Sequence, residues 1–463
     1  MSSTLGDSDL LELLAVDLDG TLVRPGSPAW DSARQAWHLS VDQRPVAVVL
    51  AESARDIVAV VHTARALGLQ VAAQATGHNA APLGPLGGTI LLKTSAMRGV
   101  QIDPRARVAR VEAGAQWQDV TDAAAKYGLA ALAGSARDVG VVGYTLGGGL
   151  SWLGRSHGLA ANSVVAIEVV TADGSQRRAT AEHEADLFWA LRGGGGSFGI
   201  VTALEFRLFP LTEVHAGVLF FPVERAEEVL QAWRCWLPSL PDEVTSVGRI
   251  LRFPPLLDLP PHLSGKSYVV VEAACQLPPA EADLLLAPLR ALGPELDTFC
   301  PTPVAALSAL HMDPDGPVPA WGDGMLLDEL PEHAVSEFVR SAEGAGRALL
   351  SAELRHLGGA LRPGHEGGGA VDGLAAGFAL FAVGITADKE AVRAVKAGTE
   401  AVHHAMAPWS TGRCYLNFAE RSKSGAALFG EAVHRRLGEV KEAYDPADVI
   451  RSNHPVKASE PAR

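Results

Sequence analysis

Glycine-rich loops recur between Gly77 and Gly199, and they limit what this chain can fold into. Runs such as 147–149 and 193–196 weaken any helix or strand interior, because glycine loses more backbone entropy on folding than other residues. Their use is close approach of the main chain to a ligand, since consecutive unhindered N–H groups can wrap a pyrophosphate without a lysine. One such loop alone would be an ordinary turn, but the set together predicts a site for a phosphate-bearing ligand.

Two familiar phosphate-binding motifs do not explain these loops. The sequence has no G-x-x-x-x-G-K-[ST], which excludes a nucleoside triphosphatase loop. No G-x-G-x-x-G opens a helix with an acidic residue about 20 positions further on, so a Rossmann-type dinucleotide fold is disfavoured.

Composition sets the class of protein. The chain has 463 residues, 48% of them hydrophobic, so it can bury a large core and is expected to form two or three structural units. Its formal charge of −14 disfavours nucleic acid as a partner, which needs a basic face. The four cysteines are dispersed, Asp7 and Asp9 stand where a signal peptide would be basic, and no apolar run could span a bilayer. We therefore expect a cytoplasmic protein with no membrane partner; the oligomeric state stays open.

The order of helical and strand-like segments predicts an interrupted first domain. Helical and strand patterns alternate from Arg44 to Pro210, and Ser53 and Gly68 are the predicted caps of a helix between them. Beyond Pro210 the glycine clusters thin out. A short strand over 414–418 and a helix over 430–443 then resume the alternation of strands and helices seen before Pro210. The predicted units are 1–212, with 413–463 returning to it, and an inserted 213–412.

A stretch near the N-terminus offers a different function. The sequence from Asp17 to Thr21 spells D-x-D-G-T, the loop of haloacid dehalogenase-type phosphatases, and the apolar run 13–16 precedes it. The rest of that pattern is missing: Pro25 and Pro28 interrupt the following segment, and no later lysine and aspartate pair completes a magnesium site. A turn is the favoured interpretation, and a phosphatase is the remote alternative.

Several motifs together resemble one family. They are His78 after Gly77, Val111–Ala115 with Trp117, Val139–Gly149, Asp186–Gly199, Tyr415–Phe418 and Tyr444–Pro446. Their residues and order are similar to those of FAD-linked oxidases of the p-cresol methylhydroxylase and vanillyl-alcohol oxidase fold, in the berberine-bridge-enzyme-like branch. The resemblance implies an α+β fold: a two-subdomain FAD-binding unit with an inserted α/β substrate domain of antiparallel sheet and helices. Residues 1–212 and 413–463 would bind FAD, and 213–412 would bind substrate.

The resemblance also implies how FAD is held. His78 matches the histidine that bonds covalently to the 8α-methyl carbon of the flavin, whereas Ala136 fills the place of a second, cysteine tether. The family pattern differs here at Gln74, where arginine is common, and at Thr76, where glycine is common. Val139 matches a position that gates oxygen, Asn162 a ribose or pyrophosphate contact, and 199–201 the adenine-side strand. The residues implied to bind the cofactor are Thr76, Gly77, His78, Asn79, Asp138, Val139, Gly143, Gly147, Gly148, Asn162, Gly199, Ile200, Val201 and Asn417.

The resemblance identifies the catalytic groups less directly than the cofactor-binding residues. Plant members use a tyrosine as base where this chain has Phe418, so Tyr415 is the first candidate, although an unperturbed phenol pKa of about 10 would have to fall. Tyr144 lies where a histidine often contacts the N1–C2=O edge of the flavin, and its phenol could donate there. Glu353 and Arg355 alternate on a predicted strand and so share one face, as site residues or as a surface ion pair. His311 and His356 are weaker candidates.

The activity that the resemblance implies is an FAD-dependent oxidase. A small-molecule substrate (an alcohol, amine or sugar) would give a hydride to flavin N5, and dioxygen would be reduced to hydrogen peroxide. The alternative is a dehydrogenase that passes its electrons to another acceptor. No metal site is expected.

Overall fold

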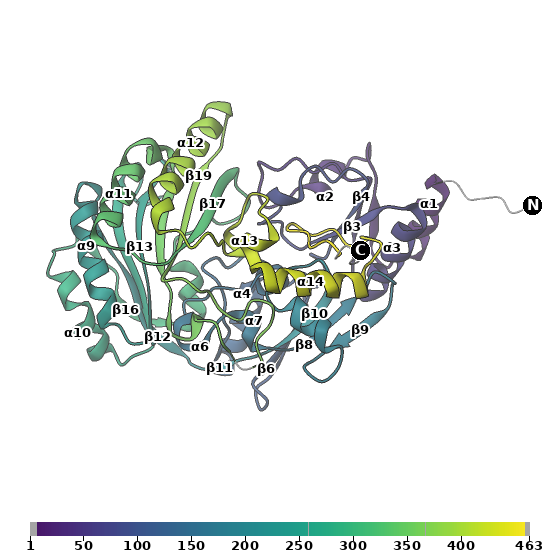
Figure 1. Ribbon diagram of the computed structural model, residues 1–463, viewed down its shortest axis with the longest axis horizontal. Coiled ribbons are helices and arrows are strands. Elements are labelled where there is room, and N and C mark those ends of the chain that lie inside the picture. Colours follow the sequence, from purple (N-terminus) through teal and green to yellow (C-terminus); the bar gives the residue numbers. More distant parts are fainter. Residues whose placement is uncertain (1–6, 258, 366, 459–463) are drawn as a thin grey trace, which may run out of the picture.

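Three β-sheets and a two-stranded ribbon organise the part of the chain that the computed structural model describes, residues 7–257, 259–365 and 367–458 (Figure 1). The first two sheets and the returning C-terminal segment form one side of the molecule. The third and largest sheet forms the other side. No helix in these residues is both long and apolar enough to cross a membrane.

The first sheet has the order β1-β2-β4-β3, from β1 (Thr21–Val23), β2 (Ala47–Leu50), β4 (Thr89–Lys93) and β3 (Gln70–Gln74). Strands β2, β4 and β3 are parallel, and α3 (Ala54–Leu67) makes the crossover from β2 to β3. The predicted caps of this helix are confirmed: the Ser53 side chain accepts from the Asp56 N–H, and Gly68 takes the left-handed conformation with φ 63°.

The second sheet is antiparallel throughout. Its order is β5 (Val100–Asp103), β6 (Val108–Glu112), β10 (Ile200–Arg207), β8 (Val164–Val170) and β9 (Gln176–Ala179). The glycine-rich segments lie around short helices beside it, α5 (Val141–Leu146), α6 (Gly154–His157) and α7 (Ala160–Ser163). The remaining elements of this side are α2 (Trp30–Arg34), α4 (Trp117–Ala125), α8 (Ala185–Leu191) and the ribbon of β7 (Leu129–Ala130) with β11 (Phe209–Pro210).

The third sheet is also antiparallel and begins at Glu213. Its order is β15 (Leu296–Asp297), β12 (Glu213–Pro222), β14 (Ser267–Cys275), β13 (Val244–Arg252), β18 (Ser351–His356), β19 (Phe378–Ile385) and β17 (Ala320–Leu327), with β16 (Cys300–Pro303) paired to β12. Four helices, α9 (Ala226–Trp236), α10 (Pro279–Arg290), α11 (Glu332–Glu343) and α12 (Lys389–Met406), cover its outer face in Figure 1. Trp233 and Phe338 are fully buried in the core between helices and sheet.

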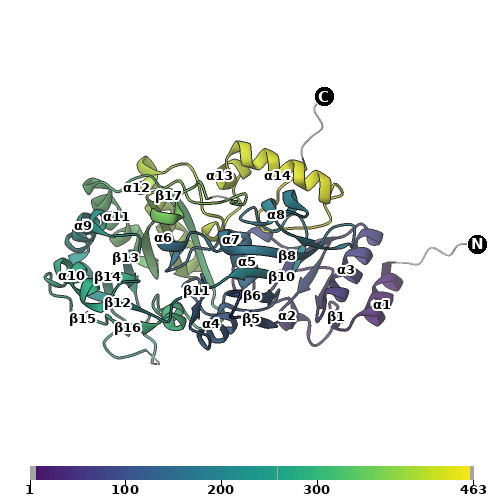
Figure 2. The same ribbon diagram turned by 90° about the horizontal axis from the view of Figure 1, so that it is seen from below.

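The chain then returns to the first side. Helices α13 (Gly425–Phe429) and α14 (Glu431–Tyr444) follow, and α14 packs against α8, as Figure 2 shows. The helix predicted over 430–443 is thus confirmed. The short strand predicted over 414–418 is wrong, because Leu416–Phe418 forms a 3₁₀ turn. Its main-chain bonds close locally, from the Phe418 N–H to the Tyr415 carbonyl, and pair with no strand.

The phosphatase alternative is wrong. The apolar run before Asp17 belongs to helix α1 (Asp7–Asp17), whereas a phosphatase loop has to follow a strand. The main chain of Asp19 and Gly20 instead donates to the buried carboxylate of Asp56, at 2.7 and 3.2 Å. The D-x-D-G-T stretch is therefore a turn that packs on the N-terminus of α3.

Candidate functional site

A cavity of about 1070 Å³ lies where the three sheets meet. Its walls come from the loops 73–80, 134–147, 195–201, 415–420 and 450–453 on one side, and from strands β13, β18 and β19 on the other. A volume of this size can enclose a large organic ligand. The glycine-rich segments and the third sheet, which are far apart in sequence, therefore face the same space.

Most of the residues predicted for the site line this cavity. They are Thr76, Gly77, His78, Asn79, Val139, Gly143, Tyr144, Gly147, Gly199, Ile200, Val201, Glu353, Tyr415 and Asn417. Asp138 is not part of the lining but contacts His78. Gly148 and Asn162 lie outside the lining as well.

Asn162, predicted to contact ribose or pyrophosphate, is held by contacts within the protein. It is buried, and its amide nitrogen donates to the Asp372 carbonyl at 2.8 Å. Arg207 in turn donates to the Asn162 carbonyl at 2.8 Å. The side chain thus ties the end of α7 to another loop, and its amide oxygen is buried without a partner.

The histidine loop leaves β3 at Gln74 and turns sharply at Gly77, whose φ is +90°. A Cβ at Gly77 would come within 2.9 Å of the Ala36 side chain, so the turn needs glycine for both reasons. The His78 ring that follows is stacked on Trp37, with ring centroids 4.0 Å apart and an interplanar angle of 19°. Packing against Trp37 fixes the plane of the imidazole at the edge of the cavity.

Both nitrogens of His78 have neighbours. Nδ1 lies 2.8 Å from the Thr76 hydroxyl, and Nε2 lies 3.4 Å from the Asp138 carboxylate. Trp37 Nε1 donates to the other oxygen of Asp138 at 2.5 Å. Burial would raise the pKa of Asp138, but the hydrogen bond and charge of His78 outweigh it and lower that pKa. An anionic Asp138 favours the tautomer with hydrogen on Nε2, which leaves the lone pair on Nδ1. In the sequence, the only indication of this arrangement was Thr76, which stands where the family commonly has glycine.

The glycine loop after Gly140 leads into α5 and approaches the C-terminal part of the chain. A Cβ at Gly147 would collide with the amide of Asn417, so glycine is required for this contact. The Asn417 amide donates both to the Tyr144 carbonyl and to the Tyr415 hydroxyl, at 2.9 Å each. Asn417 therefore holds the glycine loop and the returning segment together at the cavity wall.

The two tyrosines predicted for the site are both held by hydrogen bonds within the protein. The Tyr144 hydroxyl donates to the Leu132 carbonyl at 3.2 Å, so its hydrogen is engaged by the main chain. Burial raises the pKa of Tyr415 well above the usual range for a phenol, although the Asn417 hydrogen bond opposes this. This raised pKa disfavours Tyr415 as the base. Since Phe418 has no ionisable group either, any proton acceptor has to come from another element.

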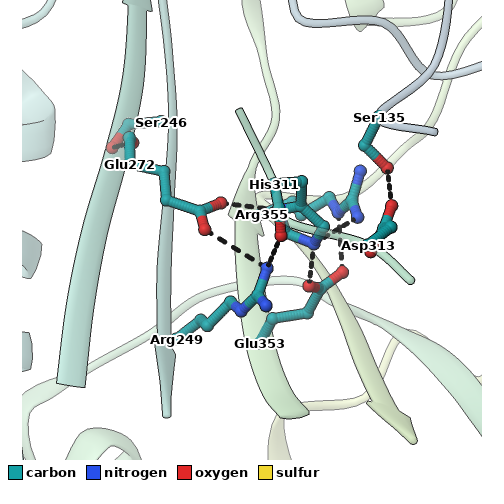
Figure 3. A network of polar contacts seen from close by, with 8 residues as sticks. All are labelled: Ser135, Ser246, Arg249, Glu272, His311, Asp313, Glu353 and Arg355. Carbon is teal, nitrogen blue, oxygen red and sulfur yellow. Dashed lines mark hydrogen bonds and ion pairs between the residues drawn. The ribbon is translucent and has the colours of Figure 1, made fainter. Parts of the chain in front are cut away.

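That element is the third sheet, which presents a buried network of charged side chains (Figure 3). His311 lies at its centre: Nδ1 is 2.5 Å from Glu272, and Nε2 is 2.7 Å from Glu353. Arg355 Nε donates to Glu353 at 2.7 Å, and Arg249 donates to Glu272 at 3.2 Å. Glu353 and Arg355 therefore form no surface ion pair, because Glu353 is only 1% exposed.

The network also bridges the two sides of the molecule. Asp313, close to His311, accepts a hydrogen bond of 3.0 Å from Ser135, which belongs to the loop before α5 (Figure 3). Arg355 lies over the ring of Phe418, 5.0 Å from its centroid. Sequence reasoning considered His311 only weakly, and it missed Arg249, Glu272 and Asp313, whose contacts join segments far apart in the chain.

Opposite charges set the protonation states in this network. Burial and Arg249 lower the pKa of His311, but Glu272 and Glu353 outweigh them, so that this pKa is raised. Burial would raise the pKa of Glu353, but Arg355 and then His311 outweigh it and hold this pKa far below the usual range. Glu353 is accordingly a carboxylate, and the two carboxylates against the ring nitrogens of His311 favour its protonated form. By contrast, burial and Arg155 lower the pKa of His356 to about 3, so His356 is a neutral ring outside the cavity.

The C-terminal segment 450–453 lines the cavity because a buried ion pair holds it. Lys441, 1% exposed, lies 2.5 Å from Asp445, which is fully buried. Asp445 also accepts from the N–H groups of Val449 and Ile450, both at 2.8 Å. The motif Tyr444–Pro446 is therefore a structural element that positions one wall of the site.

The residues at the cavity fit FAD. Both amide atoms of Gln74 and the amide oxygen of Asn79 are buried without a partner, and both residues line the cavity. Buried polar atoms of this kind require a hydrogen-bonding ligand or water. Next to them, Gly143, Gly195 and Gly196 leave their main chain open toward the same space, as close contact with a pyrophosphate requires. No cluster of His, Cys, Asp or Glu among the described residues could hold a metal ion.

Comparison with known proteins agrees with this fit. Residues 45–180 match the family described as the FAD binding domain. An uncharacterized FAD-linked oxidoreductase of Bacillus subtilis, YvdP, is 27% identical to the chain, and the match covers 94% of this chain and 98% of that protein.

Solved structures share the whole fold. BBE-like 1 of Physcomitrella patens has a TM-score of 0.85 at 19% identity and covers 97% of this chain and 99% of its own. The 6-hydroxy-D-nicotine oxidase of Arthrobacter nicotinovorans has a TM-score of 0.80 at 23% identity, with 95% and 98% covered. The predicted fold class and the predicted family resemblance are confirmed.

Proposed function

We propose that this chain, which belongs to the FAD-linked oxidoreductases with the berberine-bridge-enzyme-like fold, is an oxidase that acts on a substrate C–H bond. The observation that carries the proposal is one cavity, lined on one side by the glycine loops and His78 and on the other by the charged network of the third sheet. Bound FAD would supply the redox chemistry, by accepting a hydride from the substrate at N5 and being reoxidised by dioxygen, which yields hydrogen peroxide. The protein then has to hold FAD, orient the substrate and take up one proton.

His78 is the proposed attachment point for FAD. Asp138 and Trp37 fix the ring so that Nδ1 carries the lone pair; attachment would replace its contact with the Thr76 hydroxyl by a bond to the electrophilic methyl carbon, toward which imidazole nitrogen is a competent nucleophile. Ala136 also lines the cavity but cannot form a bond, so we propose a single covalent link.

His311 is the proposed proton acceptor once it has released its own proton, and Glu353 positions its ring. Both line the cavity beside Arg355, whose positive charge would stabilise an oxyanion as a substrate hydroxyl loses its proton. His311 and Glu353 share a hydrogen bond of 2.7 Å and titrate as a pair. Because the pair accepts a proton more readily once His311 has released its own, kcat/KM should rise with pH through the raised pKa of His311.

Val139 supports an oxidase over a dehydrogenase. Its small side chain lines the cavity next to Gly140 and Gly143, and a bulkier residue would narrow this space. Val139→Leu should therefore slow reoxidation by dioxygen while turnover with an artificial electron acceptor is kept. A dehydrogenase, our second candidate, is favoured by Ala136, because a single link gives a lower flavin potential than two.

The test starts from the purified protein and its spectrum. Yellow absorbance that stays with the protein after acid precipitation supports a covalent flavin, and peroxide released in step with substrate oxidation supports an oxidase. Flavin reduction that is reversed by an artificial acceptor but not by dioxygen would establish the dehydrogenase instead. All four cysteines are free, as expected for the cytoplasmic location that we propose.

A further inference from the structure

The substrate-facing wall of the cavity changes from charged to apolar along three neighbouring strands. In the register of β13, β18 and β19, Arg249 lies opposite Glu353, and Glu353 lies opposite Phe381. Two residues along each strand, Leu251, Ser351 and Val383 form the next row. All six side chains line the cavity, because residues two apart on a strand share a face. The residues between them, such as Ile250 and Ala382, are buried under the helices.

The apolar part of the wall continues toward solvent. Ile385 follows Val383 on the same face, and Phe253 follows Leu251. The proline-rich loop after Phe253 adds Leu256, Leu259 and Leu263 to the lining. Leu256 is 51% exposed, which places this end of the wall at the surface. On these three strands the charged side chains are thus confined to the inner rows, at Arg249, Glu353 and Arg355, whereas the exposed Asp315 lines the cavity from another segment.

From this division we infer that the substrate is an amphipathic alcohol, with one hydroxyl at Glu353 and Arg355 and an apolar body against Leu251, Val383 and Ile385. The inference rests on the proposed oxidase function and names its substrate class. Apolar groups gain from leaving water at this wall. A sugar would place several hydroxyls against the same side chains, and each unpaired hydroxyl weakens binding by about 5- to 150-fold.

The charges at the inner end favour a neutral head group over an amine. Glu353 is already bound by His311 and Arg355, and Glu272 by His311 and Arg249. With Asp313 the network holds three carboxylates against Arg249, Arg355 and the His311 ring between Glu272 and Glu353, so an added ammonium group would find no carboxylate in excess. A hydroxyl can accept from Arg355 and donate to Glu353 without adding a charge.

The test is a homologous series of linear 1-alkanols from butanol to octanol. Each alcohol is titrated anaerobically into the flavin-loaded enzyme, and binding is followed by the shift or bleaching of the flavin absorbance. Each methylene buried against the wall should lower Kd by about fourfold. A Kd that does not depend on chain length, or saturation by glucose, cellobiose or benzylamine at lower concentrations than octanol, would overturn the inference.

A variant at Val383 tests whether the dependence of Kd on chain length arises at the apolar wall of the cavity. Val383→Thr is nearly isosteric and suits a strand, so it should keep the flavin spectrum while it weakens octanol binding several-fold more than butanol binding. The matched control is Val16→Thr on α1, where the valine is 82% exposed and far from the cavity. An unchanged dependence on chain length in Val383→Thr would contradict the inference.

The two proposals fail separately. If alkanols bind with the expected dependence on chain length but no peroxide or oxidised product forms, the oxidase proposal is overturned and the substrate wall is supported. If peroxide forms from sugars while the alkanol series is flat, the oxidase is supported and the amphipathic alcohol is overturned.

Discussion

The contact between Glu353 and His311 gives the sharpest prediction for the site. The perturbation is a double-mutant cycle with Glu353→Gln and His311→Gln, in which glutamine keeps polarity and approximate size but removes the charge. Both side chains are buried, and Glu353 makes two contacts of 2.7 Å, to His311 and to Arg355. Removing one partner leaves the other charge buried without compensation, which typically costs about 3–5 kcal/mol.

The magnitude follows from which charges remain. Glu353→Gln leaves His311 and Arg355 with one carboxylate fewer, so we expect a loss of about 3 kcal/mol in the free energy of unfolding. His311→Gln leaves Glu272 and Glu353 without the cation between them, and a similar loss is expected. The double variant loses less than the sum, by at least about 1 kcal/mol, because the charge stranded by each single change is then absent.

The pH dependence has a definite sign for each group. The pKa of Glu353 is depressed on folding, so its contribution is present above its ordinary value of 4.5 and is lost as the pH falls toward the folded value. The pKa of His311 is raised, so its contribution is complete below its ordinary value of 6.5 and is lost as the pH rises through the folded value. Both contributions are complete between about pH 4.5 and 6.5, and the coupling energy should shrink above that window.

The assay is urea unfolding of the flavin-loaded proteins, followed by tryptophan fluorescence at pH 6 and at pH 9. The matched control is Glu205→Gln. Glu205 pairs at the surface with Arg178, and the Arg178 side chain is 53% exposed. This substitution should therefore change the free energy of unfolding by less than about 1 kcal/mol. Single changes that add to within about 0.5 kcal/mol, or a coupling energy that is the same at both pH values, would refute the reasoning.

Three further predictions concern the cofactor side of the cavity. His78→Ala should bind flavin that is released by acid precipitation, and flavin still attached to the denatured chain would disprove the link through His78. Asp138→Ala should slow covalent incorporation when the flavin-free chain is reconstituted with FAD, because the anion that holds hydrogen on Nε2 is gone; exposed Asp186→Ala is the control, and equal rates would argue against the positioning role. Asp445→Ala should cost about 1–3 kcal/mol in unfolding free energy, since the buried N–H groups of Val449 and Ile450 lose their acceptor while Lys441 keeps only Asp448, at 3.0 Å; an unfolding free energy within about 0.5 kcal/mol of wild type would contradict this.

Several elements of the site could be predicted from the sequence. Ser53 and Gly68 marked the ends of α3, because a side-chain acceptor and a left-handed turn are needed there whatever surrounds the helix. Gly77 and His78 marked the sharp turn beside the cavity. Glu353 and Arg355 were assigned to one face, since alternation along a strand is a property of the backbone alone.

Other features depend on contacts that are distant in sequence. The strand expected over 414–418 is wrong, because the segment lies beside β17 but closes its own main-chain hydrogen bonds in a 3₁₀ turn. Burial, which a sequence does not display, raises the pKa of Tyr415 and disfavours it as the base. The Asp372 carbonyl, 210 positions away, accepts from the Asn162 amide.

The sequence by itself determined the local features of this protein: where glycine allows the main chain to turn or to approach a ligand, where helices begin and end, and which residues alternate on a strand. These depend on covalent geometry and on neighbours within a few residues. Only the tertiary structure decided that Glu272, His311 and Glu353 form one network, and that Ser135 reaches it from the opposite side of the cavity. Sheet register and packing bring these groups together, and their charges are set by burial and by one another, which are properties of the folded chain.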